Sequence, residues 1–352
     1  MARARLRELG IVIGDLPPGP NNAITDVADV WVGHTTVIQD EPRVARTGVT
    51  VVVPRAGEMF TDPCFAAYHS FNGNGEMTGI HWIAESGMLG TPIALTNTHQ
   101  VGIVRDALVE YECRRHPARE WLLPVVAETY DGFLNDINAF HLTKEHVFAA
   151  LAAAGPGPLS EGCVGGGTGM ICHAFKGGIG TASRVAETKS GPYTVGVLVQ
   201  ANYGERRDLR VNGIPVGRAL PHERVPVPWQ QRPKDGSIII LLATDAPLLP
   251  VQCRRLAQRA AVGLGRVGGM GHNGSGDIFL AFATGNHLSG GDAPVPLRML
   301  PNHTIDPLFR AAVEAVEEAI LNAMIAAETM TGQQGRTAYA LPLDQLQELM
   351  AT

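Results

Sequence analysis

The sequence predicts a layered α/β protein, and three observations lead to this fold class. Several short segments are apolar almost throughout, which is typical of strands buried on both faces of a sheet. Three longer segments show helical spacing behind residues that can begin a helix. The 352 residues are 45% hydrophobic and 18% charged, which provides ample material for a large core. No internal repeat is present, and we expect a single domain over residues 1–352.

The predicted strands are six runs rich in Val, Ile, Leu and Ala. They cover residues 49–53, 92–96, 121–127, 193–199, 237–243 and 277–283. They alternate unevenly with the predicted helices. A segment with five prolines and mixed charge, residues 215–234, precedes the fifth strand and is expected to be an exposed loop.

Three helices are predicted from capping residues and apolar spacing. Thr98 and Thr143 are the expected N-caps of the first two. Their apolar faces carry Val101, Val104, Leu108 and Tyr111 in the first helix and Val147, Ala150 and Leu151 in the second. The third helix has Asp306 as its expected N-cap and Pro307 at its first position, and it is expected to end near Gly332.

Charge and composition argue against several classes of function. The net charge is −6, and no Lys/Arg run is interleaved with aromatic residues, so a nucleic-acid partner is not expected. No run approaches the roughly 18 apolar residues of a membrane span, and the apolar run at 9–15 is too short for a signal peptide. Five scattered cysteines do not form a disulfide framework or a zinc motif. We expect a cytoplasmic protein without metal, cofactor or membrane partner.

The junction between Gly236 and Ser237 is the most informative feature of the chain, because Ser237 opens a buried strand. A serine hydroxyl is a weak nucleophile without an adjacent base. Cleavage before Ser237 would create such a base, an α-amino group with a pKa of about 7.7–8.0. Glycine suits the preceding position because a strained backbone costs least without a Cβ. A serine that simply follows a turn is the alternative, so the hypothesis requires partner residues elsewhere.

Polar side chains at the ends of other predicted strands could supply those partners. Glu128 could bind a substrate ammonium, and Asn202 could donate an amide N–H to an oxyanion. Ser275 and Asp277 share a face if the chain between them is extended, and together they could move a proton. Each of these residues could instead cap a turn, but their occurrence together favours a site.

Two glycine clusters, at 162–169 and 177–180, offer a different reading as phosphate-binding loops. Their spacing fits neither the P-loop nor the dinucleotide-binding fingerprint, and Lys176 lies on the wrong side for a P-loop. We expect them to allow close backbone packing around a buried site. No G-x-S-x-G motif occurs. The histidines show no fixed spacing from a serine that would indicate a Ser-His-Asp triad, apart from His272, which is three residues from Ser275.

These segments together resemble the L-aminopeptidase/D-esterase (DmpA-like) family, which includes the β-peptidyl aminopeptidases. The resemblance extends over nearly the whole chain. It is carried by residues 21–27, 74–79, 128–132, 165–170, 176–181, 197–202, 235–237, 243–248 and the helix around 317–319. It implies a four-layer αββα sandwich of the N-terminal-nucleophile type and a precursor that cleaves itself before a serine.

The resemblance also implies a role for each candidate residue. Ser237 matches the nucleophile and new N-terminus, and Asn202 matches the oxyanion donor. Ser275 and Asp277 match the second serine and its acidic partner, which is glutamate in some relatives. Glu128, with Tyr130 beside it, matches the residue that receives the substrate amino group.

The expected protein is therefore a self-processing serine aminopeptidase, cut into residues 1–236 and 237–352. It would release N-terminal residues from small peptides, amides or esters with a free amino group, through an acyl-enzyme on Ser237. The resemblance implies a homo-oligomer of cleaved protomers. An acyltransferase similar to ornithine acetyltransferase, whose nucleophile is normally threonine, and a non-catalytic ligand-binding protein remain the alternatives.

Overall fold

Two β-sheets form the centre of the protein. The computed structural model describes residues 3–57, 59–117, 120–229, 236–288 and 291–351. The four-stranded sheet has the order β1 (Trp31–Gln39), β2 (Ala45–Val53), β5 (Ile93–Asn97) and β6 (Val125–Thr129). The six-stranded sheet has the order β4 (Met88–Leu89), β3 (Cys64–Gly73), β12 (Gly276–Ala283), β11 (Ser237–Thr244), β10 (Gly191–Asn202) and β9 (Gly178–Thr188). Two hairpins, β7 (Ile171–Cys172) with β8 (Phe175–Lys176) and β13 (Met330–Thr331) with β14 (Thr337–Ala338), lie outside these sheets.

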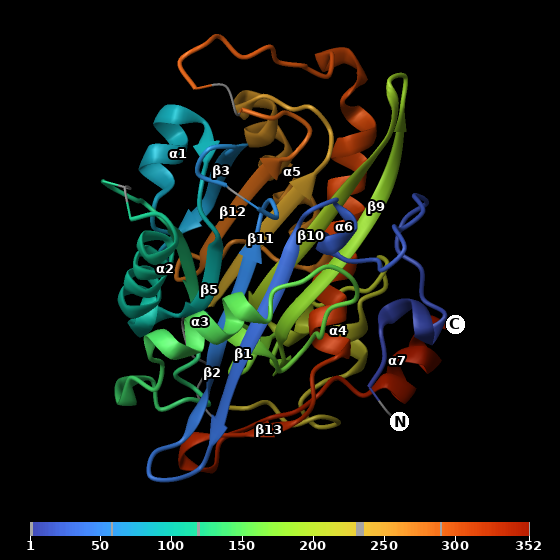
Figure 1. Ribbon diagram of the computed structural model, residues 1–352. Helices are drawn as coiled ribbons and strands as arrows, with labels where there is room; N and C mark the ends of the chain where they lie inside the picture. The colour runs from blue at the N-terminus through green and yellow to red at the C-terminus, as the bar shows by residue number, and fades with distance from the viewer. Residues whose placement is uncertain (1–2, 58, 118–119, 230–235, 289–290, 352) are drawn as a thin grey trace.

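Helices cover the outer face of each sheet, and the two inner faces pack on each other (Figure 1). The helices are α1 (Ile80–Ser86), α2 (Val101–Arg115), α3 (Lys144–Ala152), α4 (Val216–Ala219), α5 (Pro250–Val267), α6 (Asp306–Ile325) and α7 (Leu343–Met350). Helices α2 and α3 share a core with the four-stranded sheet, and α5 and α6 share one with the six-stranded sheet. The expected αββα sandwich is thus confirmed.

The alternation of side chains along β11 shows why its sequence is apolar throughout. Ile238 and Ile240 belong to the core beneath α5 and α6. Ile239 and Leu241 belong to the core between the two sheets. Since successive side chains of a strand point to opposite faces, both faces of β11 are dry, as expected for a strand in the middle of a layered protein.

All six predicted strands are present, with shifted boundaries, but three long strands were not predicted. Residues 121–124 precede β6 and are not part of it. The strands missing from the prediction are β1, β3 and β9, which contain polar residues and glycines among the apolar ones. Helix α5, with 18 residues, was not predicted either.

The predicted helices are present, but two of the three predicted caps are wrong. Thr143 is the N-cap of α3, as expected. Before α2, a short 3₁₀ helix begins after Asn97, whose side chain accepts hydrogen bonds from the backbone N–H groups of His99 and Gln100. Thr98 is therefore not the cap, and its hydroxyl donates to Glu128 instead. Helix α6 follows Ile305 and ends at Ile325, because Ala326 already closes its last turn, and it does not extend to Gly332.

The segment before β11 is not the wholly exposed loop that its prolines suggest. Val216, Leu220 and Val225 are buried and pack in the core of the six-stranded sheet. Arg206 donates hydrogen bonds to the backbone carbonyls of Leu220 and Val225 and holds this segment against the molecule. Residues 230–235 lie outside the described part of the chain.

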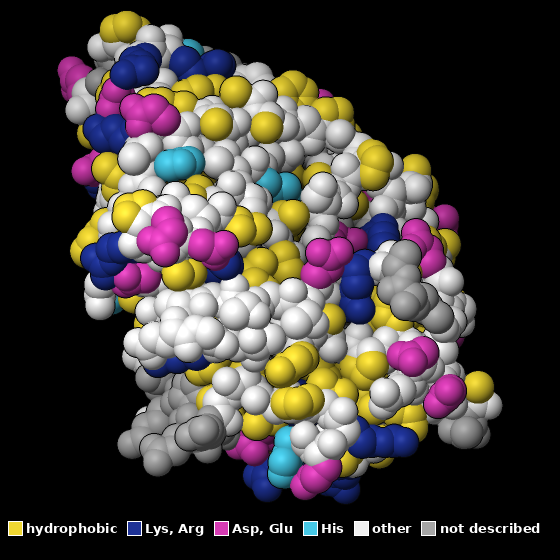
Figure 2. Space-filling view, turned by 90° about the horizontal axis from the view of Figure 1, so that it is seen from below, with side chains coloured by type: hydrophobic (Ala, Val, Ile, Leu, Met, Phe, Trp, Pro, Cys, Tyr) yellow, Lys and Arg dark blue, Asp and Glu magenta, His cyan; other side chains and the backbone are white. Residues whose placement is uncertain are grey.

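On the surface seen from below, the described Lys, Arg, Asp and Glu side chains are interspersed with apolar ones and do not gather into a broad basic patch (Figure 2). None of the helices in the described ranges has the length and apolarity required to cross a membrane.

Candidate active site

Strands β10, β11 and β12 bring four of the candidate residues to one end of the six-stranded sheet. Asn202, the last residue of β10, lies directly opposite Ser237 in antiparallel register. Ser237 in turn pairs with Gly276 in parallel register, so Ser275 and Asp277 flank this position. The Ser237 side chain is nearly buried, with 4% of its surface exposed.

Ser237 and Asn202 point into the space between the two sheets. Ile239 and Leu241, which follow Ser237 at intervals of two residues, lie in that core, so alternation places Ser237 on the same face. Residues directly opposite each other in an antiparallel pair share a face. The hydroxyl and the amide are therefore on one side of the sheet.

Ser275 and Asp277 lie on the other face. Asp277 pairs with Ile238, which belongs to the core beneath α5 and α6. The Ser275 hydroxyl donates to Asp277 Oδ1 at 2.6 Å, so the two side chains lie together, as expected. In the described part of the chain no hydrogen bond joins the hydroxyls of Ser275 and Ser237, because the Ser275 hydroxyl is bound to Asp277 on the opposite face from Ser237.

The orientation of the Asn202 amide is fixed by backbone groups. Its Oδ1 accepts from the N–H of Ile171 at 2.8 Å, and its Nδ2 donates to the carbonyl of Tyr130 at 2.9 Å. A backbone N–H can only donate and a carbonyl can only accept, so the oxygen and nitrogen cannot be exchanged. One of the two hydrogens on Nδ2 is used by Tyr130, and within the described ranges the other forms no hydrogen bond.

The carbonyl of Gly236 is polarised by a hydrogen bond from β12. Its oxygen accepts from the Gly276 N–H at 3.0 Å. A Cβ at Gly236 would lie 3.1 Å from both the Asn202 carbonyl oxygen and Tyr203 Cα, which is tighter than ordinary packing. Glycine lets the chain approach β10 closely at the bond before Ser237.

Glu128, at the end of β6, brings a buried carboxylate to the same end of the sheets. Its Oε1 accepts from the Glu76 N–H at 3.0 Å, and Oε2 accepts from the Thr98 hydroxyl. A Cβ on Gly75 would lie 3.3 Å from Glu128 Oε1 and 3.1 Å from Gly276 Cα. Gly75 therefore lies between the Glu128 carboxylate and the first residue of β12, and it contacts both.

Burial raises the pKa of Glu128, and the hydrogen bonds from Thr98 and Glu76 oppose this shift in part. Burial also raises the pKa of Asp277, against hydrogen bonds from Ser275 and from the backbone of Ile238. Both carboxyl groups thus lie where their negative charge is poorly solvated. A cation that approached either of them would be strongly attracted.

Tyr130 occupies a different position from the other candidates. Its side chain is 41% exposed, and its ring lies against Gly132, where a Cβ would come within 2.4 Å of the hydroxyl oxygen. Its backbone carbonyl accepts a hydrogen bond from Asn202 Nδ2. The structure therefore ties Tyr130 to the site through its main chain.

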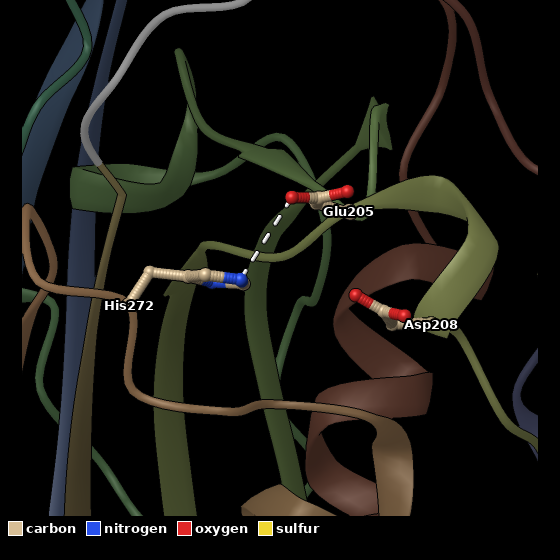
Figure 3. Close-up of side chains that lie close together, drawn as sticks. All are labelled: Glu205, Asp208 and His272. Carbon is tan, nitrogen blue, oxygen red and sulfur yellow. Dashed lines mark ion pairs between the residues drawn. The ribbon is translucent and has the colours of Figure 1, made fainter.

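A second polar cluster, which was not predicted from the sequence, is formed by Glu205, Asp208 and His272 (Figure 3). One ligand atom from each lies within 4.8 Å of the others, and His272 Nε2 is 3.8 Å from Glu205 Oε1. These residue types can bind a divalent metal. The Arg207 guanidinium, 3.0 Å from Glu205 Oε2, already places a positive charge beside these carboxylates.

The layered fold places this protein in the class that has the N-terminal-nucleophile hydrolase fold. L-aminopeptidase D-Ala-esterase/amidase from Ochrobactrum anthropi is described as a prototype of the serine aminopeptidases and as a variant of that fold. Its structure is similar to this chain with a TM-score of 0.92 and 45% identity, covering 99% of this chain and 98% of the other.

The family follows from the sequence comparison. Residues 22–338 match Peptidase family S58, and the chain belongs to this family. β-Peptidyl aminopeptidase BapA of Sphingosinicella microcystinivorans is 48% identical over 98% of this chain and 91% of its own length. A β-aminopeptidase from Burkholderia sp. has a TM-score of 0.93 and 54% identity, covering 99% of this chain and 98% of its own. The aminopeptidase expectation is confirmed, and the acyltransferase and ligand-binding alternatives find no support.

Proposed function

We propose that the chain cuts itself between Gly236 and Ser237 and that Ser237 then acts as the nucleophile of an aminopeptidase. The observation that carries this proposal is the position of the Gly236–Ser237 peptide. Its carbonyl accepts a hydrogen bond from Gly276, and its serine lies opposite Asn202. Family membership supports the same reading.

In self-cleavage, Ser237 Oγ attacks the carbonyl carbon of Gly236, and the bond from that carbon to the Ser237 nitrogen breaks. The hydroxyl proton moves to the departing nitrogen, and an ester links Gly236 to Ser237 Oγ. The Gly276 N–H polarises the carbonyl and stabilises charge on its oxygen. Water then hydrolyses the ester and leaves a free carboxylate on Gly236 and a free amine on Ser237.

In turnover, the new α-amino group acts as the base for its own hydroxyl. Ser237 Oγ attacks the acyl carbon of the substrate, and Asn202 Nδ2 donates to the oxyanion. The leaving amine or alcohol departs, and water releases the acyl group from Ser237. We assign Ser275, oriented by Asp277, to proton exchange with the new α-amino group, since the two hydroxyls lie on different faces of the sheet.

Glu128 is the proposed site for the substrate's free amino group. Its buried carboxylate pairs with no cation in the described part of the chain, and a substrate ammonium would supply the missing charge. The main chain of Tyr130 supports Asn202 beside it. Small peptides, amides and esters with a free amino group are the proposed substrates. The names of the relatives lead us to include N-terminal β-amino acids.

A denaturing gel with intact-mass measurement tests the self-cleavage. Purified protein is expected as two polypeptides, residues 1–236 and 237–352, that share one domain. Ser237→Ala is expected to remain a single chain without peptidase activity. A wild-type chain that is active while uncut would exclude the mechanism.

We also propose that the cleaved protomers associate with one another in the cytoplasm. Trp82 and Trp121 support the association, because their rings meet edge to face at 5.4 Å while 40% and 55% of their surfaces remain exposed. Large exposed aromatic residues are typical of interfaces. Sedimentation at several protein concentrations tests the oligomeric state, and cell fractionation tests the location.

A further inference from the structure

Lys176, at the end of β8, carries a charge that the mechanism above does not use. Its side chain is fully buried, and in the described ranges no carboxylate forms an ion pair with it. Its ammonium donates to the carbonyls of Met170 at 2.8 Å, Gly177 at 2.9 Å and Gly167 at 3.5 Å. The Cys163 thiol also lies beside it, and burial lowers the pKa of the lysine. A buried cation held only by dipoles is costly.

The hairpin of β7 and β8 explains how the lysine reaches these carbonyls. Its turn residues His173 and Ala174 have positive φ angles of 49° and 59°, as in the tight turns that join neighbouring strands. This turn places Lys176 opposite Ile171. The lysine side chain therefore returns to the peptide unit that connects Met170 to Ile171.

That single peptide unit links Lys176 to the candidate oxyanion donor. Its oxygen, on Met170, accepts from Lys176 Nζ, and its N–H, on Ile171, donates to Asn202 Oδ1. Both hydrogen bonds are 2.8 Å long. A continuous chain of two amide groups thus runs from the buried ammonium to Asn202 Nδ2.

We propose that Lys176 is a positioning residue that strengthens the Asn202 amide as a hydrogen-bond donor to the oxyanion. A cation at the carbonyl oxygen draws electron density through the peptide and makes its N–H a stronger donor. Hydrogen bonding to Oδ1 polarises the Asn202 amide in the same direction, as occurs in hydrogen-bond chains within a low dielectric. The positive charge then acts on the transition state without touching the substrate. This inference rests on the oxyanion role proposed above for Asn202.

A purely structural role makes a different prediction. On that account Lys176 only fastens the glycine-rich turn at 165–170, and its loss lowers stability and affects all activity through misfolding. On our proposal, the loss acts on kcat through Asn202 and disappears when Asn202 cannot donate.

The test is a double-mutant cycle on the full chain with Lys176→Met and Asn202→Ala, using an amide substrate with a free amine. Removing an oxyanion donor costs about 10²–10³ in kcat, and we expect Lys176→Met to cost about tenfold, with KM changed less than twofold. When Asn202→Ala is already present, adding Lys176→Met is expected to lower kcat by less than a further twofold. Intact mass gives the cleaved fraction of each variant, and kcat is calculated for each cleaved protomer.

Two further variants make the result unambiguous. Lys176→Gln keeps a donor without the charge, is expected to fall between wild type and Lys176→Met, and replaces Lys176→Met in the cycle if that variant does not fold. Arg206→Met is the matched control, because Arg206 is also a buried cation that donates to backbone carbonyls, including Ala174 of the same hairpin. It is expected to lower the melting temperature without an effect on kcat that depends on Asn202.

The outcomes separate the two proposals. Equal losses from Lys176→Met with and without Asn202, or a lower melting temperature with unchanged kcat, would overturn the role of Lys176 alone. An Asn202→Ala enzyme with wild-type kcat would instead overturn the oxyanion role on which this inference depends.

Discussion

Asn202 lies directly opposite Ser237 across the antiparallel pair of β10 and β11, and both side chains face the interior between the two sheets. This relationship joins a hydroxyl and an amide donor at the end of a rigid sheet. The backbone bonds to Asn202 from Ile171 and to Tyr130 leave the amide with one orientation. Such a donor needs no rearrangement when negative charge develops on a substrate, which is the main advantage of a preorganised site.

Removing this donor is expected to slow chemistry much more than it destabilises the fold. Asn202→Ala should lower kcat by about 10²–10³, which corresponds to about 2.7–4 kcal/mol, while KM changes little. Gln200→Ala is the control, because Gln200 lies on the same face two residues earlier and donates to Thr96 and Thr129. Steady-state kinetics on both variants decides the matter, and similar losses in kcat would assign Asn202 a structural role.

Neutralising Glu128 is expected to weaken recognition of the substrate's amino group. Hydrogen bonds to charged groups contribute about 1.5–3 kcal/mol, so Glu128→Gln should lower kcat/KM for free-amine substrates by about 10- to 100-fold. N-acetylated substrates should be hydrolysed poorly by wild type and changed little by the substitution.

The control for this comparison is Glu76→Gln, which removes a nearby exposed carboxylate and keeps the backbone N–H that donates to Glu128. It should leave both substrate types almost unaffected. If wild type hydrolysed free and blocked substrates with similar efficiency, Glu128 would not be the amine site.

The strands that were predicted from the sequence are buried strands composed mainly of large apolar residues. Strand β11 is apolar on both faces because it lies in the middle of the sheet, and its sequence shows this directly. Strand β9 is buried over residues 178–184 but is rich in Gly, Thr, Ala and Ser, since α6 packs closely on it. A Cβ at Gly180 would come within 2.0 Å of the Ala319 carbonyl oxygen. Close packing against the helix therefore requires small residues in this strand, and small residues do not give the apolar pattern from which a strand is predicted.

Helix α5 could have been found by the same rules that revealed α6. Pro250 stands in its first turn, and Cys253, Leu256, Ala257, Ala260, Leu264 and Val267 form one buried face. Its five-residue run from Ala260 to Leu264 contains a glycine, and Gly263 packs against Val316 of α6, where a Cβ would be 2.7 Å from the Val316 side chain. The glycine that weakens the helical signal permits the two helices to approach.

In the candidate site, too, the residues could be predicted from the sequence but their arrangement could not. Ser237, Asn202, Ser275 and Asp277 were recognisable because each stands at the end of an apolar run. The face on which each side chain lies depends on strand register, which a single sequence does not specify. The charge of Lys176 was visible, but its link to Asn202 depends on a two-residue turn and a long-range hydrogen bond.

Ser275 and Asp277 are expected to act as a unit in proton transfer. Ser275→Ala and Asp277→Asn should each slow self-cleavage and turnover by roughly 10²–10⁴, the usual effect of a positioned proton-transfer group. The double variant should be no slower than the worse single variant, because the 2.6 Å bond between them makes one acid–base system. Rates of precursor cleavage and of substrate hydrolysis give the two readouts.

The conservative variant Asp277→Glu retains the carboxylate and should keep more activity than Asp277→Asn. Melting temperatures control for folding. A Ser275→Ala enzyme that is fully active but less stable would make the serine a turn residue whose hydroxyl only satisfies its surroundings.

Asp131 should make the stability of the protein depend on pH. Burial raises its pKa to about 7, although hydrogen bonds from Thr47 and Asn135 oppose the shift. A carboxyl whose pKa is higher in the folded than in the unfolded state binds its proton more tightly when folded. The resulting stabilisation is complete below the unfolded pKa of about 3.9, and it is lost as the pH rises to about 7. The loss is about 4 kcal/mol as an upper limit, at about 1.4 kcal/mol for each unit of pKa.

Asp131→Asn should remove this dependence, because an amide has the same shape and does not ionise. Relative to wild type, the variant is expected to melt at a higher temperature at pH 8, and this advantage should shrink steadily toward pH 4. The difference between the two melting curves at each pH cancels the other titrating groups, which both proteins share. Asn135→Ala is a useful companion: it removes a donor that favours the charged carboxylate, so its destabilisation should be larger at pH 8 than at pH 4. A constant difference between wild type and Asp131→Asn from pH 4 to pH 8 would show that Asp131 has an ordinary pKa in the folded protein.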